Sequence, residues 1–414
     1  MSDKGYIAVI GSGPREYREA IYRSLQPAGL WQVDSQEPTW QKPYIAGHSV
    51  LPRLNSAQVS ANLDFVVDAL RDLAAARPVT GILTFEEMFL PAACRAATDL
   101  GLPNIGVEAA ENCRDKGRTR RILTAAGLRQ PGFAFATSVA EAAEIAGQWG
   151  YPVVLKPRGL AGSIGVIMAS DAGELRDAFA AASDAARQGA QRHGGGVLVE
   201  EFLDGPEVSV DCAVLHGVVA PLFLARKRFG PPPFFEETGQ TVATDDPLLS
   251  DPDLMNVLRR SHEALGIDTG MTHTEIKLTS AGPAVVEVNG RMAGDYVTHL
   301  AYRAGGLDVA AVAGQVARGE RPDGAFRRSG AAAVQVVYAD QDGTFRSLSL
   351  PREGQHAHVV EAGRLLEAGT PVALPPRGYM SRCGYVITAA PTVDECHAAL
   401  DAALSEMALD ITPV

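Results

Sequence analysis

The segment VVEVNGR, residues 285–291, places a polar side chain at every second position of an otherwise apolar strand. Side chains at positions i, i+2 and i+4 of an extended chain point to one face. Glu287, Asn289 and Arg291 therefore emerge together, and burying them without partners would be strongly destabilising. An arginine in such a place can meet a phosphate group or a developing oxyanion. Whatever fold this chain adopts must put a polar partner opposite that face.

A second strand upstream, THTEIKLT at 272–279, carries a similar pattern. His273 and Glu275 are two residues apart and share a face, and we expect the strand with Glu287 and Asn289 to be its partner. Two carboxylates and an amide oxygen suit Mg²⁺, with Mn²⁺ as the alternative metal. A structural ion-pair network is the other interpretation of this set. For the histidine, the other interpretation is a packed, hydrogen-bonded imidazole.

Composition limits the kinds of partner that this chain can take. Apolar residues make up 46% and charged residues 21% of the 414 residues, as in a globular enzyme of two or three domains. The formal net charge of −12, without a dense Lys/Arg block, disfavours nucleic-acid and membrane partners. The five scattered cysteines include no CxxC pair, which indicates neither a disulfide framework nor a zinc site. With no signal-peptide-like or membrane-spanning apolar run, we expect a cytoplasmic protein.

The first quarter of the chain alternates between strand and helix patterns. A helix near 61–76, a strand at 80–85 and a helix over 91–101 predict a parallel α/β unit that ends near residue 110. The opening strand runs into the glycine turn GSGPRE, which suggests an NAD-binding fingerprint. Glu16 occupies the third glycine position, however, so a tight turn is the preferred interpretation over an NAD-dependent dehydrogenase.

Two stretches in the middle of the chain have features of a nucleotide site. Lys156 ends a predicted strand beside the glycine-rich loop 159–165, whose backbone N–H groups could approach phosphate oxygens. A plain surface turn would explain this loop equally well. The stretch EEFLDGPE, residues 200–207, could offer exposed backbone to a purine and a carboxylate to a ribose. A hairpin with solvated acids is the alternative. The proline-rich segment 229–247 is too long for an ordinary connection and is interpreted as an active-site loop.

The order of these parts (DK…R, strand and lysine, glycine loop, EEFLDGPE, HTE, EVNGR) resembles the ATP-grasp superfamily of carboxylate–amine ligases. Among these, the L-amino-acid ligase branch is most similar, with counterparts of GLPNIGVEAAENCRDKGRTRRIL and RCGYVITAAPTVDECHAAL. The resemblance implies an α/β ATP-grasp fold with an N-terminal parallel domain, a two-part ATP-binding region and a C-terminal α+β lobe. The corresponding ranges are 1–112, 113–310 with a smaller lid at about 130–205, and 311–414.

The resemblance also implies a role for individual residues. The nucleotide would be held by Lys116, Lys156, Gly162, Ser163, Glu200, Glu201, Leu203 and Glu207, with a γ-phosphate contact from Arg226 or Lys227. Metal ligands would be Glu275, Glu287 and Asn289, and the catalytic residues Arg291, Glu287 and Lys156. Substrate contacts would come from His273, Arg291, Gly294 and Tyr296, with the 229–247 loop, His299 and Arg382–Gly384 also at the amino-acid pocket. The chain departs from the family pattern at Gly290, where proline is usual, and at Ala293, where a glycine is usual.

The implied activity is amide-bond formation between an amino-acid-like carboxylate and an amine, with ATP and Mg²⁺, through an acyl phosphate. The resemblance further implies small-molecule substrates and a homodimer. A purine-pathway or carboxylase-type enzyme of the same superfamily is one alternative. A module that binds ATP without ligation is another, although the metal ligands and Arg291 argue against it.

Overall fold

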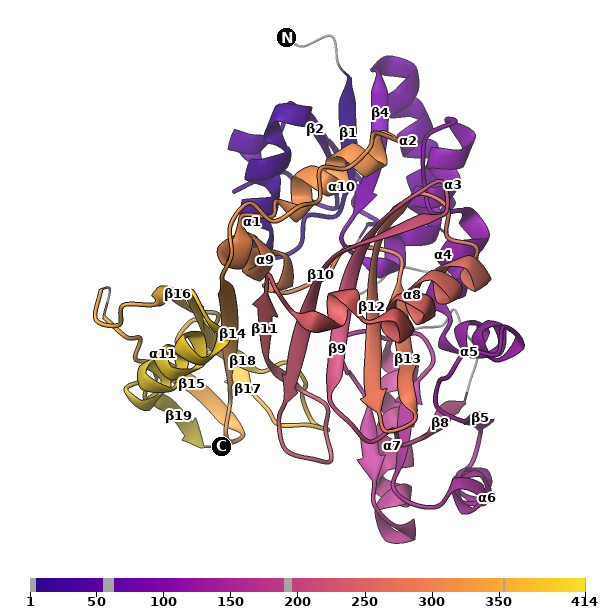
Figure 1. The fold of residues 1–414 in the computed structure, drawn as a ribbon, viewed down its shortest axis with the longest axis vertical. Coiled ribbons are helices and arrows are strands. Elements are labelled where there is room, and N and C mark those ends of the chain that lie inside the picture. The colour runs from indigo at the N-terminus through magenta and orange to yellow at the C-terminus, as the bar shows by residue number, and fades with distance from the viewer. Residues whose placement is uncertain (1–4, 55–62, 190–195, 353, 414) are drawn as a thin grey trace.

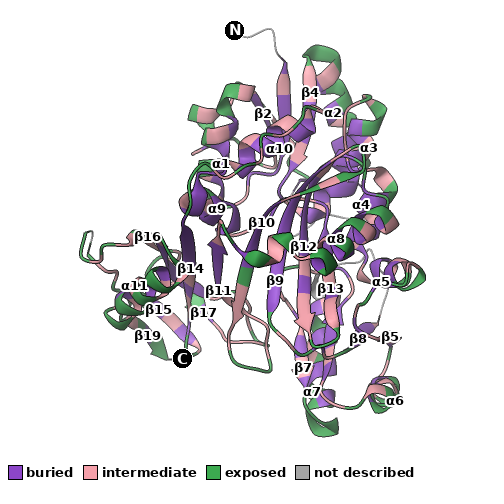
Figure 2. Ribbon diagram, in the orientation of Figure 1, coloured by how far each residue is buried: buried purple, intermediate pink, exposed green. Residues whose placement is uncertain are grey.

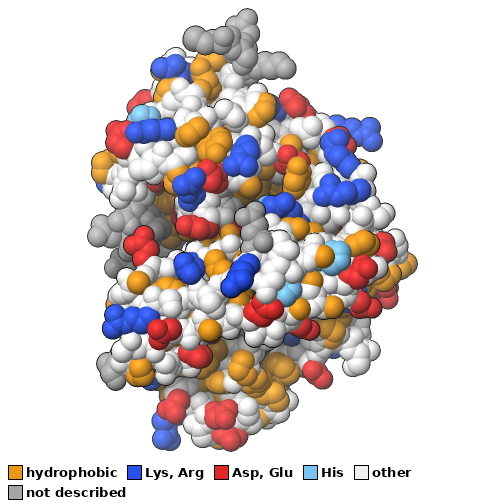
Figure 3. All heavy atoms as spheres, turned by 90° about the vertical axis from the view of Figure 1, so that its left-hand side faces the viewer, with side chains coloured by type: hydrophobic (Ala, Val, Ile, Leu, Met, Phe, Trp, Pro, Cys, Tyr) orange, Lys and Arg blue, Asp and Glu red, His pale blue; other side chains and the backbone are white. Residues whose placement is uncertain are grey.

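The computed structural model describes residues 5–54, 63–189, 196–352 and 354–413. They form a mixed α/β protein, as predicted, with one parallel sheet and three antiparallel sheets (Figure 1). Among these described residues, no helix has both the length and the apolar character needed to cross a bilayer. On the face seen in Figure 3, basic and acidic side chains are interspersed, without a large patch of one sign.

The N-terminal part is the parallel α/β unit that the alternating pattern predicts. Its four strands have the order β3-β2-β1-β4, so the order reverses between β1 and β4. The strands are β1 (Tyr6–Ile10), β2 (Leu30–Asp34), β3 (Gly47–Val50) and β4 (Val79–Thr84), and the helices α1 (Arg15–Leu25), α2 (Asp64–Ala76) and α3 (Leu90–Asp99). The expected helix near 61–76 and strand at 80–85 are confirmed by α2 and β4.

A second, four-stranded antiparallel sheet lies at the other end of the molecule (Figure 1). Its order is β5-β8-β6-β7, and α6 and α7 pack against it. The elements are β5 (Phe133–Ala136), α6 (Val139–Trp149), β6 (Val153–Pro157), β7 (Ile167–Ala169), α7 (Ala172–Gly189) and β8 (Val197–Glu201), preceded by α4 (Val107–Arg114) and α5 (Lys116–Ala125). This sheet falls within the segment where the lid is predicted.

The largest sheet has eight antiparallel strands and runs through the middle of the molecule. In spatial order they are β13 (Gly282–Asn289), β12 (Gly270–Thr279), β9 (Glu207–Leu215), β10 (Val218–Phe229), β11 (Glu237–Ala243), β14 (Ala331–Tyr338), β18 (Arg382–Ala390) and β16 (Val359–Arg364). Buried residues concentrate in its middle strands, whereas the outer faces of α6 and α11 are exposed (Figure 2). The predicted pairing of the two polar-faced strands is confirmed, because Glu275 lies opposite Glu287 and His273 opposite Asn289.

The remaining elements pack around these sheets. A three-stranded sheet is formed by β17 (Pro371–Val372), β15 (Gly343–Leu348) and β19 (Leu409–Pro413). The other helices are α8 (Pro252–Leu265), α9 (Val297–Gly305), α10 (Val309–Ala317) and α11 (Val393–Ser405), with short 3-10 helices at Gln26–Ala28, Lys42–Tyr44, Glu87–Phe89 and Pro247–Ser250. Helix α10 packs against β4 and α1 and so joins the central sheet to the N-terminal unit. The three domain ranges stay a prediction.

The interpretation of 229–247 as a continuous loop is wrong. Strand β11 occupies Glu237–Ala243 and pairs with β10 on one side and β14 on the other. Its middle residues, Gly239 to Val242, are buried, and the polar ones find partners: the Thr241 hydroxyl lies 2.9 Å from the ring of His397 on α11. The low hydrophobicity of the segment concealed a central strand. Irregular backbone is limited to the connection between β10 and β11 and a short turn at 244–246.

We expect the core under the central sheet to depend strongly on Phe223 of β10, whose side chain is fully buried in the largest apolar cluster. Phe223→Ala should lower the free energy of unfolding by about 3–5 kcal/mol, because it leaves a cavity where α9 and α10 pack. Val218→Ala on the same strand is the control, since Val218 is 69% exposed and should change stability by less than about 0.5 kcal/mol. Urea unfolding followed by tryptophan fluorescence measures the free energy of unfolding of both variants. Equal decreases for the two would contradict the dependence of the core on Phe223.

Candidate functional site

One pocket lies between the β5-β8-β6-β7 sheet, the central sheet and a segment just before β18. It is lined by most of the residues predicted to hold a nucleotide and metal, namely Lys116, Lys156, Gly162, Ser163, Glu200, Glu201, Leu203, Glu207, Lys227, Glu275 and Glu287. These residues come from helix α5, strands of two sheets, the glycine-rich loop and the connection between β8 and β9. The fold therefore brings together side chains that are up to 171 positions apart in the chain.

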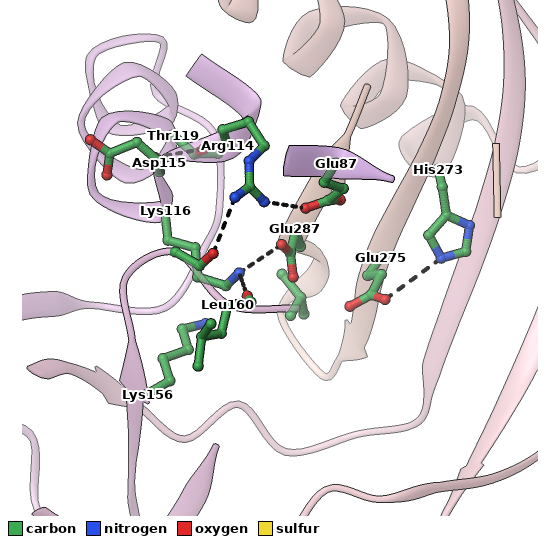
Figure 4. A network of polar contacts seen from close by, with 12 residues as sticks. Glu87, Arg114, Asp115, Lys116, Thr119, Lys156, Leu160, His273, Glu275 and Glu287 are labelled. Carbon is green, nitrogen blue, oxygen red and sulfur yellow. Dashed lines mark hydrogen bonds and ion pairs between the residues drawn. The ribbon is translucent and has the colours of Figure 1, made fainter. Parts of the chain in front are cut away.

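Two carboxylates face each other across the strands that form one wall of this pocket. Glu275 of β12 and Glu287 of β13 are directly opposed in the antiparallel register. A lysine holds each of them: Lys116 Nζ lies 2.8 Å from Glu287 Oε1 (Figure 4), and Lys227 Nζ lies 3.0 Å from Glu275 Oε1. Burial would raise the pKa of Glu275, but Lys227 and His273 outweigh it and the pKa falls well below its usual value.

Lys116 also fixes the start of the glycine-rich loop. It is the first residue of α5, next to Asp115, whose side chain caps the helix by accepting from the N–H groups of Gly117 and Arg118. Besides Glu287, the Lys116 ammonium donates to the carbonyl of Leu160 at 2.8 Å (Figure 4). One cation thus links α5, the loop and the wall of carboxylates.

Lys156 and Glu200 form a buried ionic group at the other side of the pocket. Lys156 Nζ lies 2.5 Å from Glu200 Oε2, and Arg120 Nε lies 2.7 Å from Glu200 Oε1. Burial opposes the charge on Glu200, but Arg120 and Lys156 outweigh it and lower its pKa. Burial, together with Arg120 and Lys116, lowers the pKa of Lys156 despite Glu200. The Glu200 carboxylate is therefore committed to neighbouring cations.

The structure distinguishes between Arg226 and Lys227, which the sequence left open. Successive side chains of β10 point to opposite faces. Lys227 lines the pocket and lies 2.8 Å from Glu207 and 3.0 Å from Glu237. Arg226 instead pairs with Asp246 at 2.7 Å and is not among the residues that line the pocket. Arg226 as a γ-phosphate contact is therefore contradicted by its direction.

Arg291 follows the predicted polar face but reaches a different partner. Its guanidinium lies 3.3 Å from Glu87 and donates to the carbonyl of Met292 at 2.9 Å. Glu87 also pairs with Arg114 at 2.8 Å (Figure 4). The neighbouring Gly290 packs tightly, because a Cβ there would lie 2.4 Å from a methyl carbon of Ile105. Close packing against the N-terminal unit thus accounts for glycine in place of the usual proline.

Two further predicted site residues, His273 and Asn289, lie on the same strands as Glu275 and Glu287 but do not line the pocket. His273 is buried and bonded through Nδ1 to Asp211 at 2.6 Å, with Nε2 3.6 Å from Glu275. Burial opposes protonation of the imidazole, but Asp211 outweighs it and raises the pKa to about 9. Asn289 is 5% exposed and, like His273 and Gly294, is not among the residues that line the pocket. Their direct contact with a metal or substrate stays a prediction.

Tyr296 and His299 lie at a separate cavity between α1 and α9, not at the main pocket. The Tyr296 ring stacks on Tyr385, with centroids 4.3 Å apart, and meets Tyr17 edge-on at 4.9 Å. His299 lies 3.1 Å from Glu361. Both residues thus lie apart from those predicted to hold the nucleotide, and their contact with an amino-acid substrate stays a prediction.

The C-terminal part contributes the last wall of the main pocket. Tyr379, Met380 and Arg382 line it, and the Arg382 guanidinium lies 2.7 Å from Asp295. Met380 also covers the glycine-rich loop, since a Cβ on Gly162 would lie 3.2 Å from its sulfur. Of the predicted segment Arg382–Gly384, only the arginine reaches the pocket.

The sequence interpretation missed Arg120 and the pair Glu87–Arg114. Arg120 had a detectable signal, because it shares the i, i+3 spacing of the buried residues Gly117 and Leu123 on α5. An arginine on a core-facing stripe indicates a buried ion pair. Glu87 follows β4 at the carboxyl edge of the predicted parallel sheet, where ligands and polar contacts gather.

The comparisons with known proteins agree with this arrangement. Family models match at three places: an ATP-grasp N-terminal domain at 46–104, an ATP-grasp domain at 149–299 and an L-amino acid ligase C-terminal domain at 335–412. An uncharacterized protein of Sinorhizobium fredii is 30% identical over 96% of this chain and 81% of its own length.

Two further relatives have stated activities. The alanine–anticapsin ligase of Bacillus subtilis is 28% identical over 59% of this chain and 55% of its own length. The crystal structure of an L-amino acid ligase from Bacillus licheniformis covers 100% of both chains with a TM-score of 0.81 at 23% identity, which shows the shared fold. This chain belongs to the ATP-grasp superfamily, in the branch of the L-amino-acid ligases.

Proposed function

We propose that this protein is an ATP-dependent ligase that joins an amino-acid-like carboxylate to an amine through an acyl phosphate, with release of ADP and phosphate. The observation that carries this proposal is the opposed pair Glu275 and Glu287 in a pocket that also holds Lys116, Lys156 and Lys227. Transfer of a γ-phosphoryl group needs both carboxylates that bind a metal and cations that bind the phosphates.

The chemistry of the side chains fits Mg²⁺. Carboxylates directly opposite each other in an antiparallel sheet repel unless a cation lies between them, and Glu275 and Glu287 already each bind an ammonium group. With the Asn289 amide they would supply the hard oxygen ligands that Mg²⁺ prefers. Among the described residues, no ready-made group of three His, Cys, Asp or Glu side chains suits a metal. Phosphate and water oxygens would therefore complete the shell. When bound, Mg²⁺ would neutralise charge on the phosphates.

In the first step, an oxygen of the substrate carboxylate attacks the γ-phosphorus of ATP. The bond between that phosphorus and the bridging oxygen breaks, ADP leaves, and an acyl phosphate remains. Lys116 and Lys156 would hold the phosphates, while Glu207 would accept from the ribose. Lys116 already contacts the Leu160 carbonyl. Binding of a phosphate to Lys116 would therefore change a contact of the glycine-rich loop. These residues act by position and charge, without a covalent intermediate on the protein.

In the second step, the amine attacks the acyl carbon, phosphate leaves with one of the original carboxylate oxygens, and the amine loses a proton. Arg291 would stabilise the negative charge of the tetrahedral intermediate. The glycine-rich loop and Met380 would cover the pocket and exclude water that otherwise hydrolyses the acyl phosphate. A homodimer, small amino-acid-like substrates in natural-product biosynthesis and a cytoplasmic location complete the proposal, on the resemblance and composition given above.

The proposal is tested by phosphate release from ATP and Mg²⁺ in the presence of amino acids, singly and in all pairs, with mass spectrometry of the products. We expect release that requires particular pairs, together with an adduct lighter than the two substrates by one water. Release with ATP alone, or release with pairs but no adduct, would contradict a ligase.

The role of the opposed carboxylates is tested by Glu287→Ala. Loss of a side chain that supports a metal ligand costs about 10–100-fold, so loss of a direct ligand should lower kcat by at least about a hundredfold. Circular dichroism should show a folded protein, since Glu287 lies at a pocket wall. Glu263→Ala on the surface of α8 is the control, because its carboxylate is 73% exposed. Near-normal turnover by Glu287→Ala would rule out the metal assignment.

A further inference from the structure

Arg291 is proposed to act on the reacting carbonyl, yet in the described part of the chain it is not among the residues that line the main pocket. Glu287, four residues earlier, does line it. The Arg291 guanidinium instead donates to the Met292 carbonyl at 2.9 Å and lies 3.3 Å from Glu87. It can therefore reach a substrate in that pocket only by turning away from Glu87.

The contact between Arg291 and Glu87 leaves hydrogen-bonding atoms of both side chains unmet. Within the described residues, Glu87 Oε1, which faces the arginine, is buried without a hydrogen bond, and so is Arg291 Nε. The two side chains are 7% and 15% exposed, respectively. Buried polar atoms without a partner are costly. The pair therefore holds the arginine in place, but a better acceptor would replace Glu87.

Glu87 makes its shorter contact with Arg114, on the other side of the carboxylate. Arg114 Nη1 donates to Glu87 Oε2 at 2.8 Å (Figure 4). Burial opposes the charge on Glu87, but Arg291 and Arg114 outweigh it and lower the pKa of the carboxyl. One ionised carboxylate is thus shared by two guanidinium groups, and the bond to Arg114 is the stronger of the two.

Arg114 extends this contact to the base of the glycine-rich loop. Its Nη2 donates to the Gly159 carbonyl at 3.3 Å, and Lys116 donates to the next carbonyl, that of Leu160, at 2.8 Å. Both cations therefore hold the same point of the loop. A movement of the loop base would pull on Arg114 directly, and through Arg114 on Glu87.

From these contacts we propose that Glu87 is a positioning residue that couples closure of the glycine-rich loop to the direction of Arg291. Closure moves Arg114, the carboxylate follows its shorter bond, and the contact to Arg291 breaks, so that the arginine turns into the main pocket. This relay rests on the proposed function and makes it more specific. The charge that stabilises the tetrahedral intermediate arrives only when nucleotide and loop are in place and water is excluded.

A fixed ion pair that only fastens the N-terminal unit to the central sheet is the competing explanation. The two explanations differ in what a change at Glu87 does. Breaking a fastening lowers stability and slows every step alike. Breaking the relay leaves the formation of acyl phosphate intact and impairs only the attack of the amine.

The first test measures the phosphate released per amide formed by Glu87→Gln, which keeps the size of the side chain and removes its charge. Acyl phosphate should still form but be lost to water, so this ratio should rise about tenfold or more and kcat for the amide should fall about a hundredfold, as for a misplaced catalytic group. KM for ATP should stay within about twofold, because the nucleotide contacts are unchanged.

A second variant keeps this test decisive if the first one does not fold. Glu87→Asp retains the charge but is too short to contact two guanidinium groups, and it should raise the ratio of phosphate to amide in the same direction. Circular dichroism identifies the folded variants. An unchanged ratio in folded Glu87→Gln, or in Glu87→Asp if only that variant folds, would overturn the relay.

A double-variant cycle shows whether Glu87 acts through Arg291. Once Arg291→Gln has removed the guanidinium, adding Glu87→Gln should change the rate of amide formation by less than about twofold, because effects along one chain of contacts are not additive. Losses that multiply would overturn the relay. Glu108→Gln is the matched control, since it removes the same charge from the helix of Arg114 at a side chain that is 83% exposed. It should keep the wild-type ratio.

Hydrogen exchange followed by mass spectrometry tests the coupling without turnover, using ADP and Mg²⁺ as the ligand. In the wild type, ADP should change the exchange of backbone amides both in the loop 159–165 and in the segment 290–295, because Arg291 is bonded to a carbonyl of that segment. In Glu87→Gln the change should remain in the loop and be lost from 290–295.

The outcomes separate the relay from the proposed ligation. Coupled exchange that depends on Glu87, without an amide from any amino-acid pair, would support the coupling and overturn the ligase. Amide formation with an unchanged phosphate ratio in the variant would overturn the relay and leave the ligase. The relay would also be overturned if ADP changes both segments equally in the two proteins, or changes neither segment in the wild type.

Discussion

The architecture of this ligase depends on one unfavourable contact, the direct opposition of Glu275 and Glu287 across two strands of the central sheet. Like charges at such positions destabilise a sheet, so cations must reach them. Lys227 comes from β10 of the same sheet, and Lys116 comes from the start of α5. Each lysine brings further contacts with it, to Glu207 and Glu237 in one case and to the glycine-rich loop in the other. Neutralising the carboxylates therefore assembles the pocket.

The same ion pairs explain how a pocket can be both stable when empty and ready to bind. On the proposed function, the ammonium groups that pair with Glu275 and Glu287 would turn to phosphate oxygens once a divalent cation neutralises the acids. Arg114 and Lys116 both donate to carbonyls at the base of the glycine-rich loop, Gly159 and Leu160. A change of ion-pair partner at the carboxylates would then directly change the contacts of the glycine-rich loop. The buried ion pairs of Glu200 with Arg120 and Lys156 hold the other side of the pocket in place.

Much of the fold and part of the site followed from local sequence pattern, and the failures have physical causes. The face shared by Glu287 and Asn289 and its pairing with the Glu275 strand needed only the period of two in a strand. Strand β11 was missed because its pairing with β10 and β14, and not an apolar pattern of its own, makes it a strand. The face of β10 to which Arg226 points could be known only from the register of that strand in the sheet. The separate position of Tyr296 depended on how α9 packs, which no local pattern contains.

The central claim is that the carboxylate substrate takes the γ-phosphoryl group of ATP and becomes an acyl phosphate. The most direct measurement uses a substrate with both carboxylate oxygens replaced by ¹⁸O, followed by mass spectrometry of the phosphate released in a single turnover. The account predicts that each phosphate carries one ¹⁸O atom and that the other remains in the amide carbonyl. Unlabelled phosphate, or ¹⁸O recovered in AMP, would contradict it, because the carboxylate would then never have attacked the γ-phosphorus.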